Sequence, residues 1–245
     1  MQTKSKSSLI EKSGFFIALI AGLVALLSGP GTSYGLWNYR TGISMLRGAA
    51  YGGIAAAILS LIGLIASLRI VLLRGFLWAL MGVVTGGFLG GLMLHWKQVA
   101  ESMPRIHDVT TDTEKPPEFV AILRLIRSDE NSPVYGGAEV AAQQLKAYPD
   151  IVPLILPVPT DQAFEKALAV ARHLGWQIID NDRNTGRIEA VDTTFWFGFK
   201  DDIVIRLRQK NSGSRIDIRS ASRVGVSDLG KNAERIRKFL SAMKE

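Results

Sequence analysis

The chain has 245 residues, contains no cysteine and carries a formal net charge of +7. The lack of cysteine excludes disulfide bonds, thiolate nucleophiles and cysteine-based zinc or iron–sulfur sites. The positive charge does not indicate a nucleic-acid partner, because it is concentrated in residues 1–104, which hold eight basic and two acidic side chains around long apolar segments. Residues 105–245 are nearly neutral, with 21 basic and 20 acidic side chains. We therefore expect a membrane protein whose partner is the lipid bilayer.

Three apolar segments are predicted to cross a bilayer as helices, at residues 14–36, 48–68 and 75–96. The second and third are about 20 residues long without Asp, Glu, Lys or Arg, which matches the thickness of a bilayer core. The first has a shorter apolar run and a proline at position 30, where we expect a kink or a break. A signal peptide is an alternative for the first segment, and a buried helix pair is an alternative for the other two.

Glycines recur at four-residue spacing in the second and third segments. Gly48 and Gly52 lie in the second, and Gly82, Gly86 and Gly90 lie in the third. This spacing places small residues on one helix face, where two backbones can approach closely. We expect these glycines to pack the second segment on the third, with packing between two copies of the chain as the alternative.

The orientation is predicted from basic residues that flank the apolar segments, because such residues favour the cytoplasmic side. With the N-terminus in the cytoplasm, the inner flanks hold Lys4, Lys6, Lys12, Arg69 and Arg74, and the outer flanks hold Arg40, Arg47, Lys97 and Arg105. This excess of five over four predicts a multi-pass protein of the bacterial inner (cytoplasmic) membrane, with residues 105–245 in the periplasm. A first segment that does not insert would reverse the orientation.

Residues 104–150 are predicted to be a proline-rich connector that packs on the following domain. Eight of the nine prolines fall between residues 104 and 159, which predicts mostly extended chain. Apolar side chains at roughly helical spacing occur over residues 117–128, and a short helix is expected over residues 138–147.

Residues 151–245 are predicted to form a soluble α+β domain. The pattern is strand, helix, four strands and helix, at residues 151–156, 160–174, 176–180, 187–197, 201–208, 214–224 and 228–243. Residues 211–213 are a hairpin-turn signal, and Asp228 is expected to cap the last helix. Alternation gives the strands one apolar and one charged face, so both helices can pack on the apolar face of an antiparallel sheet in a two-layer domain. This order resembles the helix-grip type, which implies an apolar ligand between sheet and helix.

Four stretches carry a resemblance to a known family: IHDVTTDTEKPPEF (106–119), YPDIVPL (148–154), RIEAVDTTFWFGFKDDIVIRLR (187–208) and SRIDIRSASRVGVSDLGKNAERIRKFL (214–240). Together they resemble the bacterial and plastid domain of unknown function 1499 family, from residue 105 to the C-terminus. The glycine-rich spans are similar to the N-terminal extension of some bacterial members. The resemblance implies a domain boundary and no catalytic residues.

The densest polar cluster of the predicted sheet is the first candidate site. Its members considered for binding are Asp201, Asp202, Arg206, Asp217, Arg219 and Arg223. Adjacent carboxylates such as Asp201 and Asp202 could bind a hard cation or act as a base, which would make the protein a metal-dependent or acid/base hydrolase. Opposite charges on neighbouring strands also stabilise a solvated ion-pair face, and this is the preferred interpretation.

An aromatic run is the second candidate site, formed by Phe195, Trp196, Phe197 and Phe199. Strand alternation would place the three phenylalanines on one side and Trp196 on the other. Core packing is one interpretation; the other is the mouth of an apolar ligand site or an anchor at the lipid headgroups, where tryptophan is favoured.

No cofactor and no metal site are predicted, because the sequence holds no phosphate loop, nucleophile elbow or paired metal-binding histidines. The preferred function is a non-enzymatic, membrane-anchored cell-envelope protein whose soluble domain binds a lipid, an envelope polymer or a protein partner. The hydrolase that uses the Asp/Arg cluster is the alternative.

Overall fold

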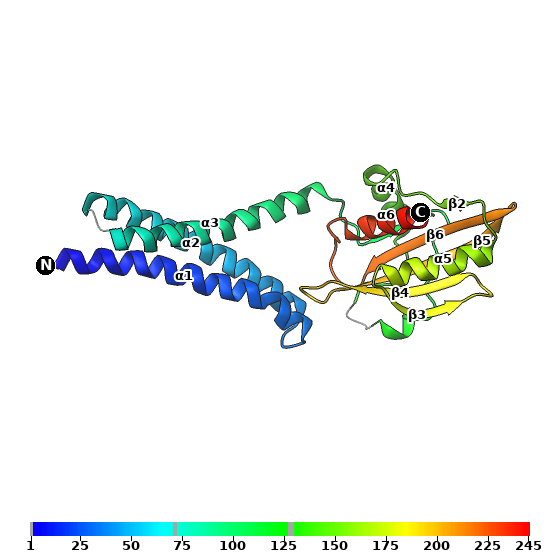
Figure 1. The fold of residues 1–245 in the computed structure, drawn as a ribbon, viewed down its shortest axis with the longest axis horizontal. Coiled ribbons are helices and arrows are strands. Elements are labelled where there is room, and N and C mark those ends of the chain that lie inside the picture. Colours follow the sequence, from blue (N-terminus) through cyan, green and yellow to red (C-terminus); the bar gives the residue numbers. More distant parts are fainter. Residues whose placement is uncertain (1, 71–72, 127–129) are drawn as a thin grey trace. The chain divides into compact units, whose positions relative to one another are not determined.

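The computed structural model describes residues 2–70, 73–126 and 130–245, without the side chains of residues 2–11, 66–70, 73 and 74 (Figure 1). The flanking residues Lys4, Lys6, Arg69 and Arg74 therefore lie outside the described side chains, and positions 127 and 128 of the expected helical stretch lie outside the described residues. The chain divides into two compact units. The helical unit is the chain up to Val99 with Trp196–Gly198, and the C-terminal unit is Ala100–Phe195 with Phe199–Glu245.

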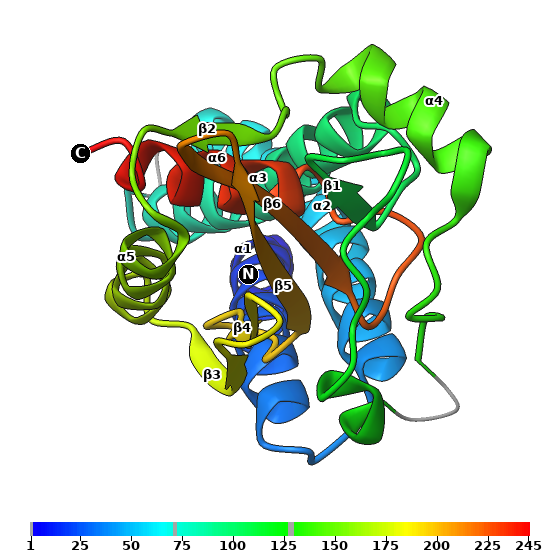
Figure 2. The same cartoon turned by 90° about the vertical axis from the view of Figure 1, so that its right-hand side faces the viewer.

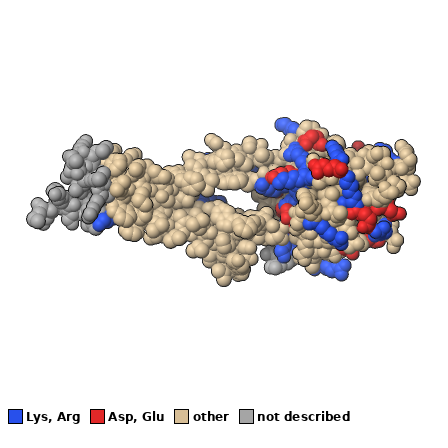
Figure 3. All heavy atoms as spheres, viewed as in Figure 1, with Lys and Arg blue, Asp and Glu red and all other residues tan. Residues whose placement is uncertain are grey.

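The helical unit contains three long helices, α1 (Gln2–Ser33), α2 (Tyr39–Ile70) and α3 (Leu73–Ser102). Within them, Lys12–Ser33, Tyr39–Ile65 and Gly75–Ser102 are long and apolar enough to cross a membrane. Figure 3 shows the same contrast on the face in view, where charged side chains gather on the C-terminal unit and the described part of the helical unit is largely free of charge.

The expected break at the proline of the first segment does not occur, because α1 continues through Pro30 to Ser33. The Ser28 carbonyl, within the turn that precedes the proline, accepts hydrogen bonds from Thr32 Oγ1 at 2.9 Å and from Trp37 Nε1 at 3.1 Å. The helix then ends in a tight turn, in which the Tyr34 amide donates to the Pro30 carbonyl. Local side-chain donors thus help to hold the last turn of α1 around a residue that has no N–H of its own.

The three glycines of α3 expected to pack on the second segment, Gly82, Gly86 and Gly90, lie against α2. A Cβ added at Gly82 would collide with Ser60, one at Gly86 with the Gly53 carbonyl oxygen, and one at Gly90 would lie 2.7 Å from Ile54. The contact between α2 and α3 therefore depends on residues without side chains. Gly48 and Gly52 of α2 do not pack on α3 as expected, because a Cβ at Gly52 would meet Ala21 of α1 at 3.5 Å and one at Gly48 would meet nothing within 4 Å.

We expect Gly86→Val to separate α2 from α3, because its side chain would overlap the α2 backbone at Gly53. The contact can be measured as disulfide formation between Ile54→Cys and Gly90→Cys, since the chain has no other cysteine. The yield should fall several-fold in Gly86→Val and stay unchanged in Gly87→Val, where a Cβ would meet nothing within 4 Å. Equal yields in the two variants would contradict the prediction.

The C-terminal unit is an antiparallel sheet with helices, as predicted. Its elements are β1 (Asp108–Thr110), the short 3-10 helix η1 (Ile122–Leu125), α4 (Gly137–Ala147), β2 (Leu154–Leu156), α5 (Thr160–His173), β3 (Gln177–Asp182), β4 (Arg187–Thr193), β5 (Lys200–Lys210), β6 (Gly213–Ser222) and α6 (Lys231–Ala242). The strand order is β1-β6-β5-β4-β3, and β2 pairs with another part of β6. The predicted helix over residues 138–147 is confirmed as α4.

The two faces of the sheet bury separate apolar layers, and Figure 2 shows α5 and α6 on the same side of the sheet. On one face α5 and α6 bury a core that includes Phe164, Ile205, Ile218 and Phe239, with Trp176 stacked on Phe239 at 5.6 Å. These side chains fill the space in which the helix-grip resemblance implied an apolar ligand. On the other face the segment before and within η1 buries a smaller layer, formed by Phe119, Ile122, Val191, Val204 and Ala221. The face predicted to be solvated is thus partly covered by residues 104–126.

The aromatic run was predicted to form the end of a strand. It forms instead the loop that joins β4 to β5. β4 ends at Thr193, and the Thr194 amide donates to the Phe199 carbonyl at 2.8 Å while the Phe199 amide donates to Thr194 Oγ1 at 2.9 Å. Gly198 has φ +67°, a conformation that glycine adopts without strain. Tight loop closure overrides the strand propensity of the aromatic residues, so the expected alternation of the phenylalanines is wrong.

Candidate functional site

The polar cluster predicted from sequence is split between the two faces of the sheet. Asp201 and Asp202 are neighbours on β5 and therefore point to opposite sides. Asp201 is 2.6 Å from Arg235 of α6 on the helix-covered face, and Asp202 is 2.8 Å from Arg223 on the other face. A metal site or an acid/base pair would need both carboxylates to face the same point. Asp201 and Asp202 do not, because they lie on opposite faces of the sheet. Among the described residues, no group of three His, Asp or Glu side chains is arranged to hold a metal ion.

Arg235 organises a buried polar network beneath α6. Its guanidinium donates to Asp192 at 2.9 Å, to Asp201 at 2.6 Å, and to Ser220 and Asn232 at 3.2 and 2.7 Å. Each nitrogen of the guanidinium thus meets an acceptor, so this network holds α6 on the sheet and leaves no donor free for a ligand.

Asp228 was expected to cap the last helix, but α6 begins at Lys231 and its N-cap is Gly230. Asp228 instead fastens the turn before the helix. Its carboxylate accepts the amide protons of Gly230 at 2.9 Å and Asn232 at 2.7 Å. Burial raises the pKa of this carboxyl, and the two amide hydrogen bonds oppose that rise.

Arg219 joins the connector to the opposite face of the sheet. Its side chain is buried and donates to both carboxylate oxygens of Asp108, at 2.9 and 2.6 Å. It also donates to the carbonyl oxygens of Pro117 at 3.2 Å and Pro133 at 2.8 Å, and lies 4.7 Å from the centre of the Phe119 ring. The prediction of a solvated ion pair is wrong here, because Pro117, Phe119, Pro133 and Tyr135 of the connector cover the pair.

Tyr135 lies on the other side of the same guanidinium, with its ring centre 5.5 Å from Arg219. Burial, followed by the nearby charge of Asp108, raises the pKa of its hydroxyl to about 12. The hydroxyl has no hydrogen-bond partner among the described residues. The tyrosine therefore contributes its ring to the buried pair.

Two further carboxylates also lie under the connector. Glu189 of β4 is fully buried and accepts the amide protons of Val120, Ala121 and Ile122 at 2.9–3.0 Å. Asp202 accepts three hydrogen bonds from Arg223, and burial raises its pKa while the arginine opposes the rise. With Arg219, these residues form what we call the buried clamp: Asp108–Arg219, Asp202–Arg223 and Glu189 with its three amides. Nothing in the sequence singled out Glu189, because a charged residue at this position fits the ordinary alternation of a strand.

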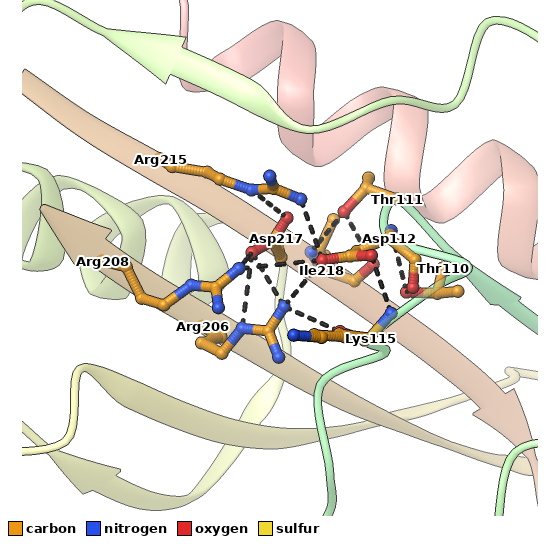
Figure 4. A network of polar contacts seen from close by, with 9 residues as sticks. All are labelled: Thr110, Thr111, Asp112, Lys115, Arg206, Arg208, Arg215, Asp217 and Ile218. Atoms are coloured by element: carbon orange, nitrogen blue, oxygen red, sulfur yellow. Dashed lines mark hydrogen bonds and ion pairs between the residues drawn. The ribbon is translucent and has the colours of Figure 1, made fainter. Parts of the chain in front are cut away.

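A second group on this face is half-exposed, and we call it the arginine cluster: Arg206, Arg208 and Arg215 around Asp217 and Asp112 (Figure 4). Asp217 is fully buried, and its oxygens accept hydrogen bonds from all three arginines at 2.9–3.3 Å. Asp112 accepts from Arg206 at 3.1 Å and from Arg215 at 2.8 Å. The register explains the grouping, since Arg206 lies opposite Asp217 and Arg208 lies opposite Arg215.

A hollow of about 570 Å³ lies beside the arginine cluster. Its lining includes Lys115, Pro116, Glu118, Arg187, Val204 and Arg206. It is formed where the connector crosses β4 and β5, and it combines both charges with apolar surface. Its volume lies within the range of small-molecule sites.

The comparison with protein families agrees with this geometry. A family model described as protein of unknown function (DUF1499) matches residues 108–243. The chain belongs to the DUF1499 family. The match runs from the first residue of β1 to the residue after α6, so both members of the Asp108–Arg219 pair lie within the DUF1499 region. A search of curated proteins finds no match.

The sequence stretches that suggested DUF1499 meet in space. Asp108 and Asp112 come from the first, Glu189 and Arg206 from the third, and Arg219 from the last. Residues from these three stretches meet in the buried clamp and the arginine cluster. The DUF1499 pattern thus describes a sheet together with the N-terminal segment that is fastened to it.

Proposed function

We propose that this protein is a multi-pass cell-envelope protein of the bacterial inner membrane, with its C-terminal unit in the periplasm and the β4–β5 loop in contact with the bilayer surface. The observation that carries the proposal is Phe195, whose side chain is fully exposed within that loop. Moving a phenylalanine ring from water into an apolar environment gains roughly 1.5–3 kcal/mol. A loop that presents such a ring is suited to a lipid interface.

The covalent link to the helices supports a bilayer partner. Only residues 103–107 separate Ser102 at the end of α3 from Asp108 at the start of β1. Such a link spans at most about 20 Å when fully extended. Since Gly75–Ser102 is long and apolar enough to cross a membrane, the C-terminal unit stays within reach of the lipid headgroups.

The periplasmic location rests on three crossings that start from a cytoplasmic N-terminus. The three candidate spans support that number of crossings. The flanking basic residues give the direction, with five on the inner side and four on the outer side. Insertion of α2 and α3 alone would place the C-terminal unit in the cytoplasm, and the bilayer contact of the loop would then form on that side.

The loop contact can be tested in the full chain, because the protein has no cysteine of its own. A polarity-sensitive label is attached to Phe195→Cys, with Ser212→Cys in the β5–β6 turn as the matched control. These turns lie at opposite ends of the β5 strand. In phosphatidylcholine nanodiscs, we expect lipid-attached quenchers to quench the label at position 195 and not the label at position 212.

Equal accessibility of both labels to a water-soluble quencher would overturn the bilayer contact. Shielding of position 195 from both kinds of quencher would also overturn it, because a protein or polymer partner would then cover the loop.

A further inference from the structure

The arginine cluster carries more positive than negative charge. Three guanidinium groups surround the carboxylates of Asp217 and Asp112, and the backbone of Lys115, whose ammonium adds a further charge, joins the same network. Within the buried clamp, by contrast, each arginine has a carboxylate of its own. The cluster therefore has unbalanced charge at a half-exposed position.

The same cluster has hydrogen-bond donors to spare. Among the described residues, the Nη1 groups of Arg206, Arg208 and Arg215 meet no acceptor. The two carboxylates are already shared, because Asp217 Oδ2 accepts from both Arg206 and Arg208, and Asp112 Oδ2 accepts from both Arg206 and Arg215. A third anionic group would therefore find free donors and one uncompensated charge.

We infer that the arginine cluster binds an oxyanion, the phosphate or carboxylate group of an envelope ligand, with the rest of that ligand in the adjoining hollow. Val204 and Pro116 offer apolar surface there for a carbon skeleton. Glu114 and Glu118 also line the hollow and are exposed, so they repel an anion from the part of the hollow that they line. The anion is thereby directed to the arginine end.

The position of the arginine cluster along β5 indicates that its ligand is not a lipid of the bilayer. Lys200, next to the aromatic loop, and Arg206 are six positions apart on β5. At about 3.3 Å per residue this is roughly 20 Å. If the loop lies at the headgroups, as proposed above, and β5 leads away from the bilayer, a bilayer phosphate cannot reach the cluster. The ligand is then a soluble molecule or a polymer of the envelope.

The experiment is a titration of the full chain in phosphatidylcholine nanodiscs with inorganic phosphate as the probe, followed by calorimetry. Arg208→Gln is the main variant, because Arg208 is 44 % exposed and Asp217 keeps two other arginines without it. We expect roughly tenfold weaker binding from the loss of one charged hydrogen-bond donor. Arg237→Gln is the matched control, since Arg237 is 45 % exposed and also pairs with an aspartate, Asp150. It should bind phosphate as the unchanged chain does.

Glu118→Gln tests the sign of the ligand charge, because removal of a repelling carboxylate should tighten phosphate binding. Weaker binding in Glu118→Gln, or equal binding in Arg208→Gln and Arg237→Gln, would overturn the assignment.

The titration is repeated in nanodiscs that contain phosphatidylglycerol. Unchanged phosphate binding supports a ligand outside the bilayer, and loss of binding would overturn that part. The label at position 195 reports the bilayer contact separately, so the two proposals fail independently.

Discussion

Arg219→Leu is expected to unfold the C-terminal unit or to bring it close to unfolding. The Arg219 side chain is 2 % exposed and its Asp108 partner is 5 % exposed. Water therefore cannot solvate either charge when its partner is removed. Leucine would leave the Asp108 carboxylate buried without a counter-charge. Breaking such a pair from one side costs about 3–5 kcal/mol. That is comparable with the whole free energy of unfolding of many domains.

The same substitution removes more than one ion pair. The carbonyl oxygens of Pro117 and Pro133 would each lose a charged donor, and the Phe119 ring would lose the guanidinium that lies 4.7 Å away. These groups belong to the connector, which Arg219 holds on the sheet together with the β1–β6 pairing and Glu189. We therefore expect the connector to detach first and to expose the apolar layer around Val204 and Ala221.

Urea titration with pulse proteolysis of the full chain in detergent measures this effect. Arg237→Gln removes an exposed ion pair and should change the free energy of unfolding by at most about 1 kcal/mol. Asp108→Leu combined with Arg219→Leu should be less destabilising than Arg219→Leu alone, because no unpaired charge remains. An Arg219→Leu variant as stable as Arg237→Gln, or a double variant less stable than the single one, would contradict the buried-charge explanation.

Much of the fold could be predicted from local sequence patterns. The apolar lengths predict the three long helices, and the alternation of Ile203, Ile205 and Leu207 with charged residues predicts the two faces of the sheet. These patterns are local, because each depends on neighbours within one helix turn or one strand. The hairpin between β5 and β6 was signalled in the same way, by Asn211, which adopts φ +55°.

The partners of the charged side chains could not be predicted in this way. Asp108 and Arg219 are 111 positions apart, and β1 has only three residues, too few to give a strand pattern. A charged residue on the outer face of a strand has the same sequence signature whether water or another segment covers it. The solvated face was expected for that reason, and the connector that covers it was predicted to be mostly extended chain.

The charges on this face therefore have two physical roles that the sequence does not separate. In the buried clamp each arginine has a carboxylate of its own, Glu189 is held by three amides, and water is excluded, so removal of these groups should change the stability of the unit. In the arginine cluster three cations share two anions and remain half-exposed, so removal of Arg208 should change phosphate binding and leave the fold intact. The contrast between Arg219→Leu and Arg208→Gln tests this division directly.

Glu189→Gln is expected to release the segment around η1 from the sheet. The Glu189 carboxylate accepts the amide protons of Val120 and Ala121 through Oε1 and that of Ile122 through Oε2, and it lies 2.8 Å from Arg187 Nε. A glutamine side chain has one acceptor oxygen and one donor nitrogen. The nitrogen would face an amide proton, a donor against a donor, in a position that water does not reach.

The cost follows from the lost charge and the unpaired groups. Hydrogen bonds to a charged acceptor contribute about 1.5–3 kcal/mol, and a buried polar group without a partner costs about 1–3 kcal/mol. We therefore expect a loss of roughly 2–4 kcal/mol, concentrated where the three amides dock. Hydrogen exchange followed by mass spectrometry should show faster exchange at residues 120–122, with a smaller change in the β5–β6 ladder.

Glu118→Gln is the matched control, because it makes the same chemical change at an exposed residue of the same segment. Its amide exchange at residues 120–122 should stay within twofold of that of the unchanged chain. If Glu189→Gln and Glu118→Gln gave the same exchange at these amides, the buried carboxylate would not be what holds the segment. If exchange rose equally across β5 and β6, Glu189 would stabilise the whole sheet and not the docking of η1.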